Sequence, residues 1–203
     1  YGNSLRAVMG ILAKFRPDMD IEKSIIKHIM TKDGGDYSKL NMIPSTIQDV
    51  KTALTTNQVD TVWVYYAWDG IALEQAGFDT NFINFAEQDK NLDFYSPVII
   101  ANNDYIKNNP EQAKAFVQAA KKGYEFAEEN PKEAADILCE NAPELDKDIV
   151  GRSQEWLADK YTADSESWGY IDPKRWNGFY NWLYDTKAIN YKISENTGFT
   201  DDL

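Results

Sequence analysis

A run of aromatic and acidic residues is the part of the sequence best suited to bind a small molecule. It contains Trp63, Tyr65, Tyr66, Trp68 and Asp69. Indole and phenol rings can stack on a flat heterocycle, and a carboxylate can accept hydrogen bonds from ring amino groups. The run therefore predicts binding of a planar ligand that carries amino substituents.

Some of these rings are equally suited to a hydrophobic core. In an extended strand, alternate side chains point to opposite faces, so Trp63 and Tyr65 would share one face and Tyr66 would lie on the other. We expect Trp63 and Tyr65 in the core, with Tyr66, Trp68 and Asp69 at or beyond the end of the strand. An aromatic residue in a turn can also cover the local core, so both roles stay open for Trp68.

The sequence lacks the residue sets of common catalytic and metal centres. Its one histidine, His28, falls on the flank of a predicted helix, where a residue at the core boundary is expected rather than a catalytic base. One histidine and one cysteine, Cys139, cannot form a zinc site, and Asp33 and Asp36 lack the spacing of a calcium loop. With no glycine-rich phosphate motif either, we predict no catalytic residue, metal or cofactor.

The composition narrows the class of partner. The 203 residues include 33 Asp and Glu against 21 Lys and Arg, and the net charge of −12 repels nucleic acids and anionic membrane surfaces. Apolar residues make up 43%, which is enough for one core or two small lobes. No apolar run approaches the roughly 18 residues of a membrane span. No signal-peptide pattern opens the chain, so we expect a soluble, mature or trimmed polypeptide.

The elements expected around the aromatic run form a βαβ unit. Residues 59–66 are β-branched and aromatic, which predicts a strand with both faces covered. A short helix is expected over 71–76, ended by Gly77, and residues 81–85 form a second extended run. Strand, helix and strand in so short a stretch indicate a parallel sheet, whose ligands bind beyond the carboxyl ends of the strands.

Further elements are predicted before this unit. The apolar spacing over 20–32 predicts a helix capped by Asp20. Residues 40–43 read as a short strand, followed by a helix that begins at Ser45 or Thr46.

Residues after the unit predict one more strand and then helices. The strand is expected over 94–101, with Tyr95 facing the same crevice as the aromatic run. Four helices are expected to follow, then an extended tail. The first, second and fourth begin at Pro110, Pro131 and Pro173, and the third is marked by Ile149, Trp156 and Leu157.

Seven segments carry a resemblance to a known family. They are residues 62–70, 94–99, 122–127, 130–131, 133–138, 168–169 and 176–183. Their sequences and order resemble the NMT1/THI5-like substrate-binding proteins of ABC transporters, over roughly residues 18–203. The resemblance implies an α/β fold like that of type II periplasmic binding proteins, in which two lobes joined by a hinge close on a small molecule.

The resemblance also implies a domain organisation. Residues 1–17 are an unmatched N-terminal segment, 18–93 form the second α/β lobe, and 94–203 form the hinge return and the helical C-terminal part of the first lobe. Complete members have further residues ahead of the match, so we expect an incomplete two-lobe architecture with a helix-rich C-terminal part. Missing strands would leave apolar surface and an open sheet edge, through which two copies could associate.

The function that the resemblance implies is capture of a thiamine pyrimidine precursor or a similar aminopyrimidine and its delivery to an ABC permease. Wider relatives bind sulfonates or other small solutes. The location implied is extracytoplasmic, either periplasmic or as a membrane-anchored lipoprotein, with the signal segment absent from this chain. Six residues are carried over as the ligand site: Tyr65, Tyr66, Trp68, Asp69, Glu74 and Tyr95.

Two other functional classes remain open. Fungal relatives are enzymes that make the pyrimidine with a catalytic histidine and a cysteine-rich run. His28 and Cys139 match neither feature, which favours binding over an enzyme of pyrimidine metabolism. The second alternative is a protein-interaction module built on the aromatic C-terminal helices.

Overall fold

The computed structural model describes residues 9–12, 20–45 and 49–203 of the chain. The chain divides into two compact units. The first unit consists of Tyr1–Asp93 with Gly178–Ile193, and the second of Phe94–Asn177 with Ser194–Leu203.

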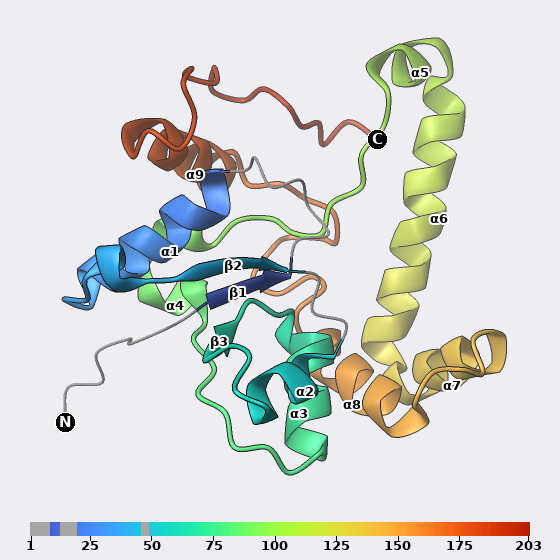
Figure 1. Cartoon of the computed structure of the whole chain (residues 1–203). Helices are drawn as coiled ribbons and strands as arrows, with labels where there is room; N and C mark the ends of the chain where they lie inside the picture. The colour runs from blue at the N-terminus through green and yellow to red at the C-terminus, as the bar shows by residue number, and fades with distance from the viewer. Residues whose placement is uncertain (1–8, 13–19, 46–48) are drawn as a thin grey trace. The chain divides into compact units, whose positions relative to one another are not determined.

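A three-stranded parallel sheet forms the centre of the first unit (Figure 1). Strand β1 (Met9–Leu12) lies between β2 (Met42–Ser45) and β3 (Thr61–Val62), with Met9 opposite both Met42 and Thr61. The sheet is parallel, as predicted, but the pairing predicted between residues 59–66 and 81–85 is wrong, because β3 pairs with β1 instead. Its central strand comes from the N-terminal segment that matched no expected element.

Helix α1 (Asp20–Lys32) has the bounds that the apolar spacing predicts. Its residues at three- and four-residue intervals are buried, and Ile26 and Met30 pack against Trp63. In Figure 1, α1 lies on one side of the sheet, while the short helices α2 and α3 lie on the other. After α1 the chain turns at Gly34, whose φ of 77° suits glycine. A short 3₁₀ turn, η1 (Tyr37–Lys39), then leads into β2.

The strand predicted over 59–66 is wrong beyond its first half. Within the described part of the chain, Thr61 and Val62 of β3 are the residues of this segment that are paired, and Tyr66–Gly70 form a π-helical turn, η2. The carbonyl of Tyr65 accepts the backbone N–H groups of both Trp68 and Asp69 at 3.0 Å, so the chain coils where extended backbone was expected.

The remainder of the predicted βαβ unit is also revised. Helix α3 (Ile71–Gln75) is present as expected, and Gly77 follows it with a φ of 71°. Residues 81–84 are not a strand, and they lead into the helical turn α4 (Phe85–Gln88) and the 3₁₀ turn η3 (Lys90–Leu92). The Asn84 side chain caps α4, because its oxygen accepts the Ala86 N–H at 3.1 Å.

Helix α2 (Val50–Thr55) begins later than predicted. Its cap is Asp49, whose carboxylate accepts the Thr52 backbone N–H at 3.1 Å and the Thr52 hydroxyl at 2.6 Å. Ser45 belongs to β2, and Thr46 lies outside the described residues.

The second unit is helical, as the periodicity predicts. Its helices are α5 (Asn103–Asn108), α6 (Pro110–Glu129), α7 (Pro131–Asn141), α8 (Lys147–Ala158) and the start of α9 (Pro173–Asp185). Helix α5 was not expected. A small core joins α7 to α8 through Ala135, Cys139 and Val150. After α9 the tail has no helix or strand, as predicted.

The strand predicted over 94–101 is wrong. Among the described residues no strand pairs with this segment, and its backbone has no ladder to join. Three of its apolar side chains face solvent: Val98 is 46% exposed, Ile99 49% and Ile100 88%.

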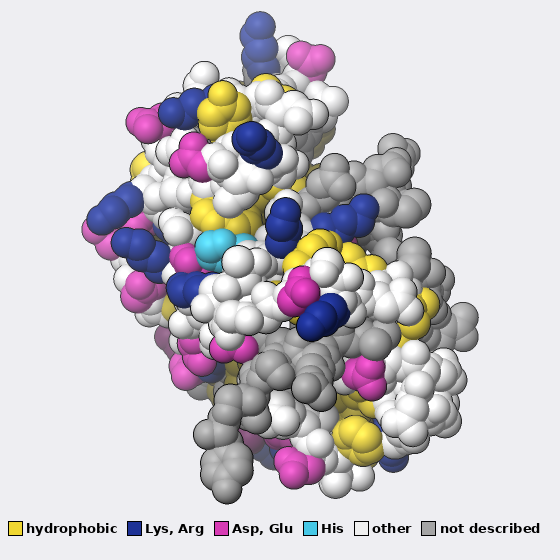
Figure 2. Space-filling model, turned by 60° about the vertical axis from the view of Figure 1, so that its left-hand side comes forward, with side chains coloured by type: hydrophobic (Ala, Val, Ile, Leu, Met, Phe, Trp, Pro, Cys, Tyr) yellow, Lys and Arg dark blue, Asp and Glu magenta, His cyan; other side chains and the backbone are white. Residues whose placement is uncertain are grey.

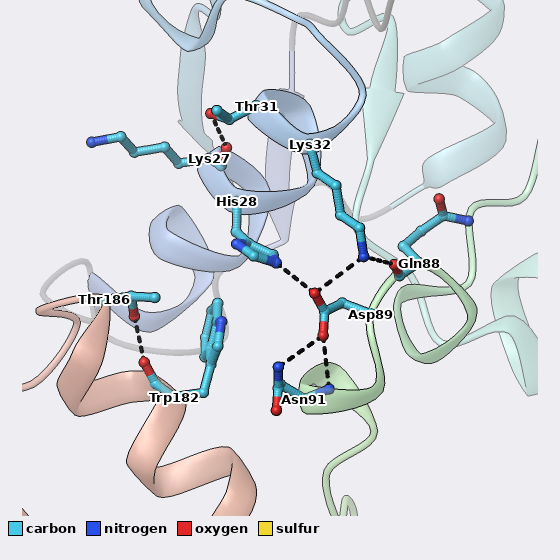
Figure 3. A network of polar contacts seen from close by, with 9 residues as sticks. All are labelled: Lys27, His28, Thr31, Lys32, Gln88, Asp89, Asn91, Trp182 and Thr186. Carbon is cyan, nitrogen blue, oxygen red and sulfur yellow. Dashed lines mark hydrogen bonds and ion pairs between the residues drawn. The ribbon is translucent and has the colours of Figure 1, made fainter.

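A polar network ties α1 to residues 88–91 in the first unit (Figure 3). One oxygen of Asp89 lies 2.9 Å from Nε2 of His28 and accepts a bond from Lys32 Nζ at 3.2 Å. The other oxygen accepts the Asn91 backbone N–H at 2.9 Å. The His28 ring also meets Trp182 edge to face, with 5.3 Å between centroids. Figure 2 shows the imidazole at the molecular surface, so His28 is the boundary residue that the sequence predicts.

Asp89→Ala is expected to lower the free energy of unfolding by about 1–2 kcal/mol at pH 7, since a helix cap, the hydrogen bond with His28 and a partly exposed ion pair with Lys32 are lost. The Asn91 N–H, His28 and Lys32 hold the pKa of Asp89 well below its ordinary value of 3.8. This stabilisation is present above pH 4 and is lost as the pH falls towards the lower folded-state pKa. The difference between the two proteins should therefore shrink between pH 7 and about pH 2.

Urea unfolding followed by tryptophan fluorescence measures this difference. The control is Asp79→Ala, an exposed site where a change within about 0.5 kcal/mol is expected at both pH values. An equal loss for Asp89→Ala at neutral and acidic pH would contradict the assigned role of the carboxylate.

Candidate functional site

Five of the six predicted ligand residues lie on one short helical segment of the first unit, residues 65–74. They are Tyr65, Tyr66, Trp68, Asp69 and Glu74. The π-helical turn η2 runs directly into α3, so these side chains project from a single short coil. Single π-helical turns occur frequently at functional sites, because the extra residue per turn changes the direction of the side chains.

Tyr66 is held in place within this turn. Its hydroxyl donates a hydrogen bond to Oε1 of Glu74 at 2.5 Å, and its ring lies 4.6 Å from that of Phe82. The ring also rests against the backbone of Gly70, where an added Cβ would lie 2.5 Å from Cδ2 of the ring. Tyr66 can therefore present its hydroxyl oxygen as an acceptor in a fixed position.

Two other rings of the turn are open to solvent. Tyr65 is 60% exposed and Trp68 is 40% exposed. The prediction that Tyr65 belongs to the core is wrong, because strand alternation ends at Val62, where β3 ends. Trp63 does pack against the core, as predicted, and meets Phe85 edge to face at 4.6 Å. The open rings of Tyr65 and Trp68 are available for stacking.

Asp69 gives the turn a carboxylate that is partly withdrawn from water. Burial raises the pKa of Asp69, and backbone N–H groups of Tyr65 and of Asp69 itself partly offset that rise. Because the fold has already removed part of the water around this carboxylate, a ligand N–H can bond to it with little further loss of hydration. Glu74 lies on the adjoining helix α3, so the local charge is acidic, which favours hydrogen-bond donors and repels anions.

Tyr95, the sixth predicted ligand residue, belongs to the second unit. Its hydroxyl oxygen accepts the Asp172 backbone N–H at 2.9 Å, and the guanidinium of Arg175 lies 4.4 Å from its ring centroid. The Asp172 N–H fixes the position of the hydroxyl, and the Arg175 guanidinium fixes that of the ring. A common ligand site for Tyr95 and the turn of the first unit stays a prediction.

A family model described as NMT1/THI5 like matches residues 16–134, which is more than half of the chain. The chain belongs to the NMT1/THI5-like family. This family implies an α/β fold like that of periplasmic binding proteins, and the parallel sheet and helices agree with it. The chain is also 27% identical over 173 residues to a formylaminopyrimidine-binding protein of Halalkalibacterium halodurans. The match covers 82% of this chain and 52% of the relative, so the chain spans about half of that protein's length.

Several residues that contact the predicted ligand residues carry no signal in the sequence. Phe82 was assigned to a strand, and no sequence signal places its ring against Tyr66. Asp172 and Arg175, which hold Tyr95, lie far from it in the sequence. The sequence does contain one signal for the packing of the Tyr66 ring: a glycine, Gly70, stands four positions further along, where the ring needs room.

The described residues contain neither a cluster suited to a metal ion nor a helix suited to a membrane. No group of three or more His, Cys, Asp or Glu side chains in residues 9–12, 20–45 and 49–203 could hold a metal ion. No helix in the same ranges is long and apolar enough to span a membrane.

Proposed function

We propose that the chain binds a formylaminopyrimidine or a closely related aminopyrimidine, as part of an extracytoplasmic binding protein that delivers the ligand to an ABC permease. The family and the name of the relative support a pyrimidine-like ligand. The observation that carries the proposal is the turn of residues 65–74, which combines two open aromatic rings with two carboxylates.

Each group of the turn has a distinct role in this proposal. The rings of Tyr65 and Trp68 stack on the pyrimidine, and each contributes about 0.5–1.5 kcal/mol beyond the buried area. Asp69 accepts an amino N–H of the ligand in a charge-assisted bond, worth about 1.5–3 kcal/mol, which sets the orientation. The Tyr66 and Glu74 pair supplies a second, fixed set of acceptors.

The second unit contributes Tyr95 in the proposed mechanism. A ligand that binds the closed form more tightly than the open form shifts the open–closed equilibrium towards the closed form, in proportion to that preference. The permease then recognises the closed protein. Binding without conversion agrees with the binding-protein name of the relative.

The charge of the turn separates pyrimidines from sulfonates as ligands. A sulfonate is a permanent anion, and it would face the carboxylates of Asp69 and Glu74 on a chain of net charge −12. A neutral aminopyrimidine supplies N–H donors that these carboxylates accept. The acidic turn therefore favours the pyrimidine class.

Trp68→Ala is expected to weaken binding of formylaminopyrimidine about 2- to 12-fold, which corresponds to one stacked ring at about 0.5–1.5 kcal/mol. Isothermal titration calorimetry measures the affinity, and quenching of tryptophan fluorescence gives a second readout. Phe116→Ala is the matched control, because Phe116 is 64% exposed and lies in the second unit. Methanesulfonate should produce no heat of binding.

Unchanged affinity in Trp68→Ala would remove this indole from the site. Tighter binding of methanesulfonate than of the pyrimidine would contradict the proposed ligand class.

A further inference from the structure

The C-terminal tail, residues 194–203, folds back on the first turns of α9 within the second unit. The indole Nε1 of Trp176 donates to the carbonyl of Thr197 at 3.0 Å. The side-chain amide of Asn177 donates to Oδ1 of Asn196 at 2.8 Å, and the Asn196 backbone N–H returns a bond to Oδ1 of Asn177 at 2.9 Å. Phe199 adds a ring contact with Trp176 at 5.3 Å. Four contacts therefore fasten the tail to the helix.

Local backbone geometry specifies the path of the tail. Gly198 has a φ of 90°, a backbone conformation that residues other than glycine rarely adopt. A Cβ at this position would also lie 3.3 Å from Cζ2 of Trp176. Asn196, with a φ of 58°, is of a residue type that tolerates the left-handed region. These two residues therefore allow the tail to pack closely against the indole of Trp176.

The last contact of the tail leads to Tyr95. Oδ1 of Asp201 accepts the backbone N–H of Ile171 at 2.9 Å. The next backbone N–H along the chain, that of Asp172, donates to the Tyr95 hydroxyl at 2.9 Å. The two amide groups are joined at the Cα of Ile171, so only the φ and ψ angles of that residue separate their orientations, and fixing the Ile171 amide narrows the directions open to the Asp172 amide. The tail and the tyrosine are therefore coupled through two successive amides.

The O–H group of Tyr95 can donate a hydrogen bond to a ligand while its oxygen accepts one from the protein. A phenol can accept and donate at the same time, and here the acceptor position is taken by the Asp172 N–H. The Arg175 guanidinium lies over the ring, 4.4 Å from the centroid, and restricts its rotation. The hydroxyl proton is left to donate to an acceptor such as a pyrimidine ring nitrogen or a formyl oxygen.

We propose that the C-terminal tail positions Tyr95 for ligand binding and that Asp201 is the positioning residue through which it acts. The inference rests on the proposed function, in which Tyr95 contacts the ligand. Asp201 itself is exposed, so its bond to Ile171 orders a local segment rather than the whole unit. Losing that bond should change the orientation of Tyr95 more than the stability of the fold.

The test compares Asp201→Ala with Asp201→Asn in the full chain. Asparagine keeps the Oδ1 acceptor, so it should restore what alanine removes. Asp202→Ala is the control, because Asp202 accepts a bond from the Thr200 hydroxyl at 3.2 Å within the tail. Gly198→Ala is a second way to displace the tail, should the first variant fail to fold.

The first readout is hydrogen exchange at the Ile171 and Asp172 amides, without ligand. Asp201→Ala and Gly198→Ala should accelerate exchange at both amides by roughly three- to tenfold, the factor that one hydrogen bond contributes. Asp201→Asn and Asp202→Ala should leave the rates unchanged. Unchanged exchange at Asp172 in both tail variants would overturn the coupling, whatever the ligand data show.

The second readout is affinity for formylaminopyrimidine. Asp201→Ala should weaken binding roughly three- to tenfold, and Tyr95→Phe should weaken it by a similar factor. In the Tyr95→Phe background, Asp201→Ala should add no further loss, because the tail acts through the hydroxyl.

The two readouts separate failure of this inference from failure of the proposed function. Faster exchange with unchanged affinity, in a chain whose binding Trp68→Ala weakens, would overturn positioning of Tyr95 and leave the proposed function intact. If the unaltered chain binds no pyrimidine, the proposed function fails together with the ligand part of this inference. Exchange at Asp172 would still decide whether the tail holds Tyr95.

Discussion

Replacing Ile25 by alanine is expected to lower the free energy of unfolding of the first unit by about 2–5 kcal/mol. The side chain of Ile25 is 1% exposed and that of Leu183 is 0% exposed. These two are the largest fully buried side chains among the described residues. The substitution removes buried methylene and methyl groups and leaves a cavity that rigid neighbours cannot fill. Because few large side chains are fully buried, this position should contribute a large share of the stability.

The same substitution at Ile100 provides the control. Ile100 is 88% exposed, so Ile100→Ala should change the free energy of unfolding by less than about 0.5 kcal/mol. Urea unfolding followed by the fluorescence of the six tryptophans, which are distributed over both units, measures the two effects. Losses of the same size in Ile25→Ala and Ile100→Ala would show that the assigned core does not carry the stability.

The helices could be predicted from the sequence because their signals are local. Helix α1 shows an apolar period and a glycine just beyond its end, and α6 and α7 each open on a proline in the first turn. A helix satisfies its backbone hydrogen bonds within one segment, so the residues that determine it are neighbours in the sequence.

The strands could not be predicted with the same success because a strand needs a partner. Residues 59–66 and 94–101 have β-branched and aromatic side chains typical of buried strands. Among the described residues, Thr61 and Val62 alone of these two segments pair with a neighbouring strand, β1, whose sequence shows no strong strand pattern. Composition predicts the capacity to form a ladder, whereas pairing depends on residues far away in the chain.

The candidate site was predictable in its residue types and not in their roles. The sequence shows that tyrosine, tryptophan and carboxylate side chains cluster near residue 66. It does not show that a π-helical turn exposes Tyr65, fixes Tyr66 against Glu74 and partly buries Asp69. These roles depend on the direction of each side chain, which the change from extended to coiled backbone decides.

Gly70→Ala is expected to destabilise the first unit by about 1–3 kcal/mol, for a steric reason. The backbone of Gly70 has a φ of −61°, which alanine adopts without strain. The new Cβ, however, would lie 2.5 Å from Cδ2 of Tyr66, closer than two carbon atoms can approach. The ring must move, and its contacts with Glu74 and Phe82 are then disturbed.

Gly123→Ala is the matched control and should have the opposite sign. Gly123 lies inside α6 with no atom within 4 Å of an added Cβ, so alanine should stabilise the second unit by about 0.5–1 kcal/mol through helix propensity. Thermal unfolding of the two variants measures both effects.

A neutral or stabilising Gly70→Ala would mean that Tyr66 is free to move. In that case the hydroxyl would not be a fixed acceptor, and formylaminopyrimidine affinity should not respond to the substitution. If Tyr66 is held as the structure shows, the same variant should weaken that affinity, because the position of the tyrosine and its bond to Glu74 change together.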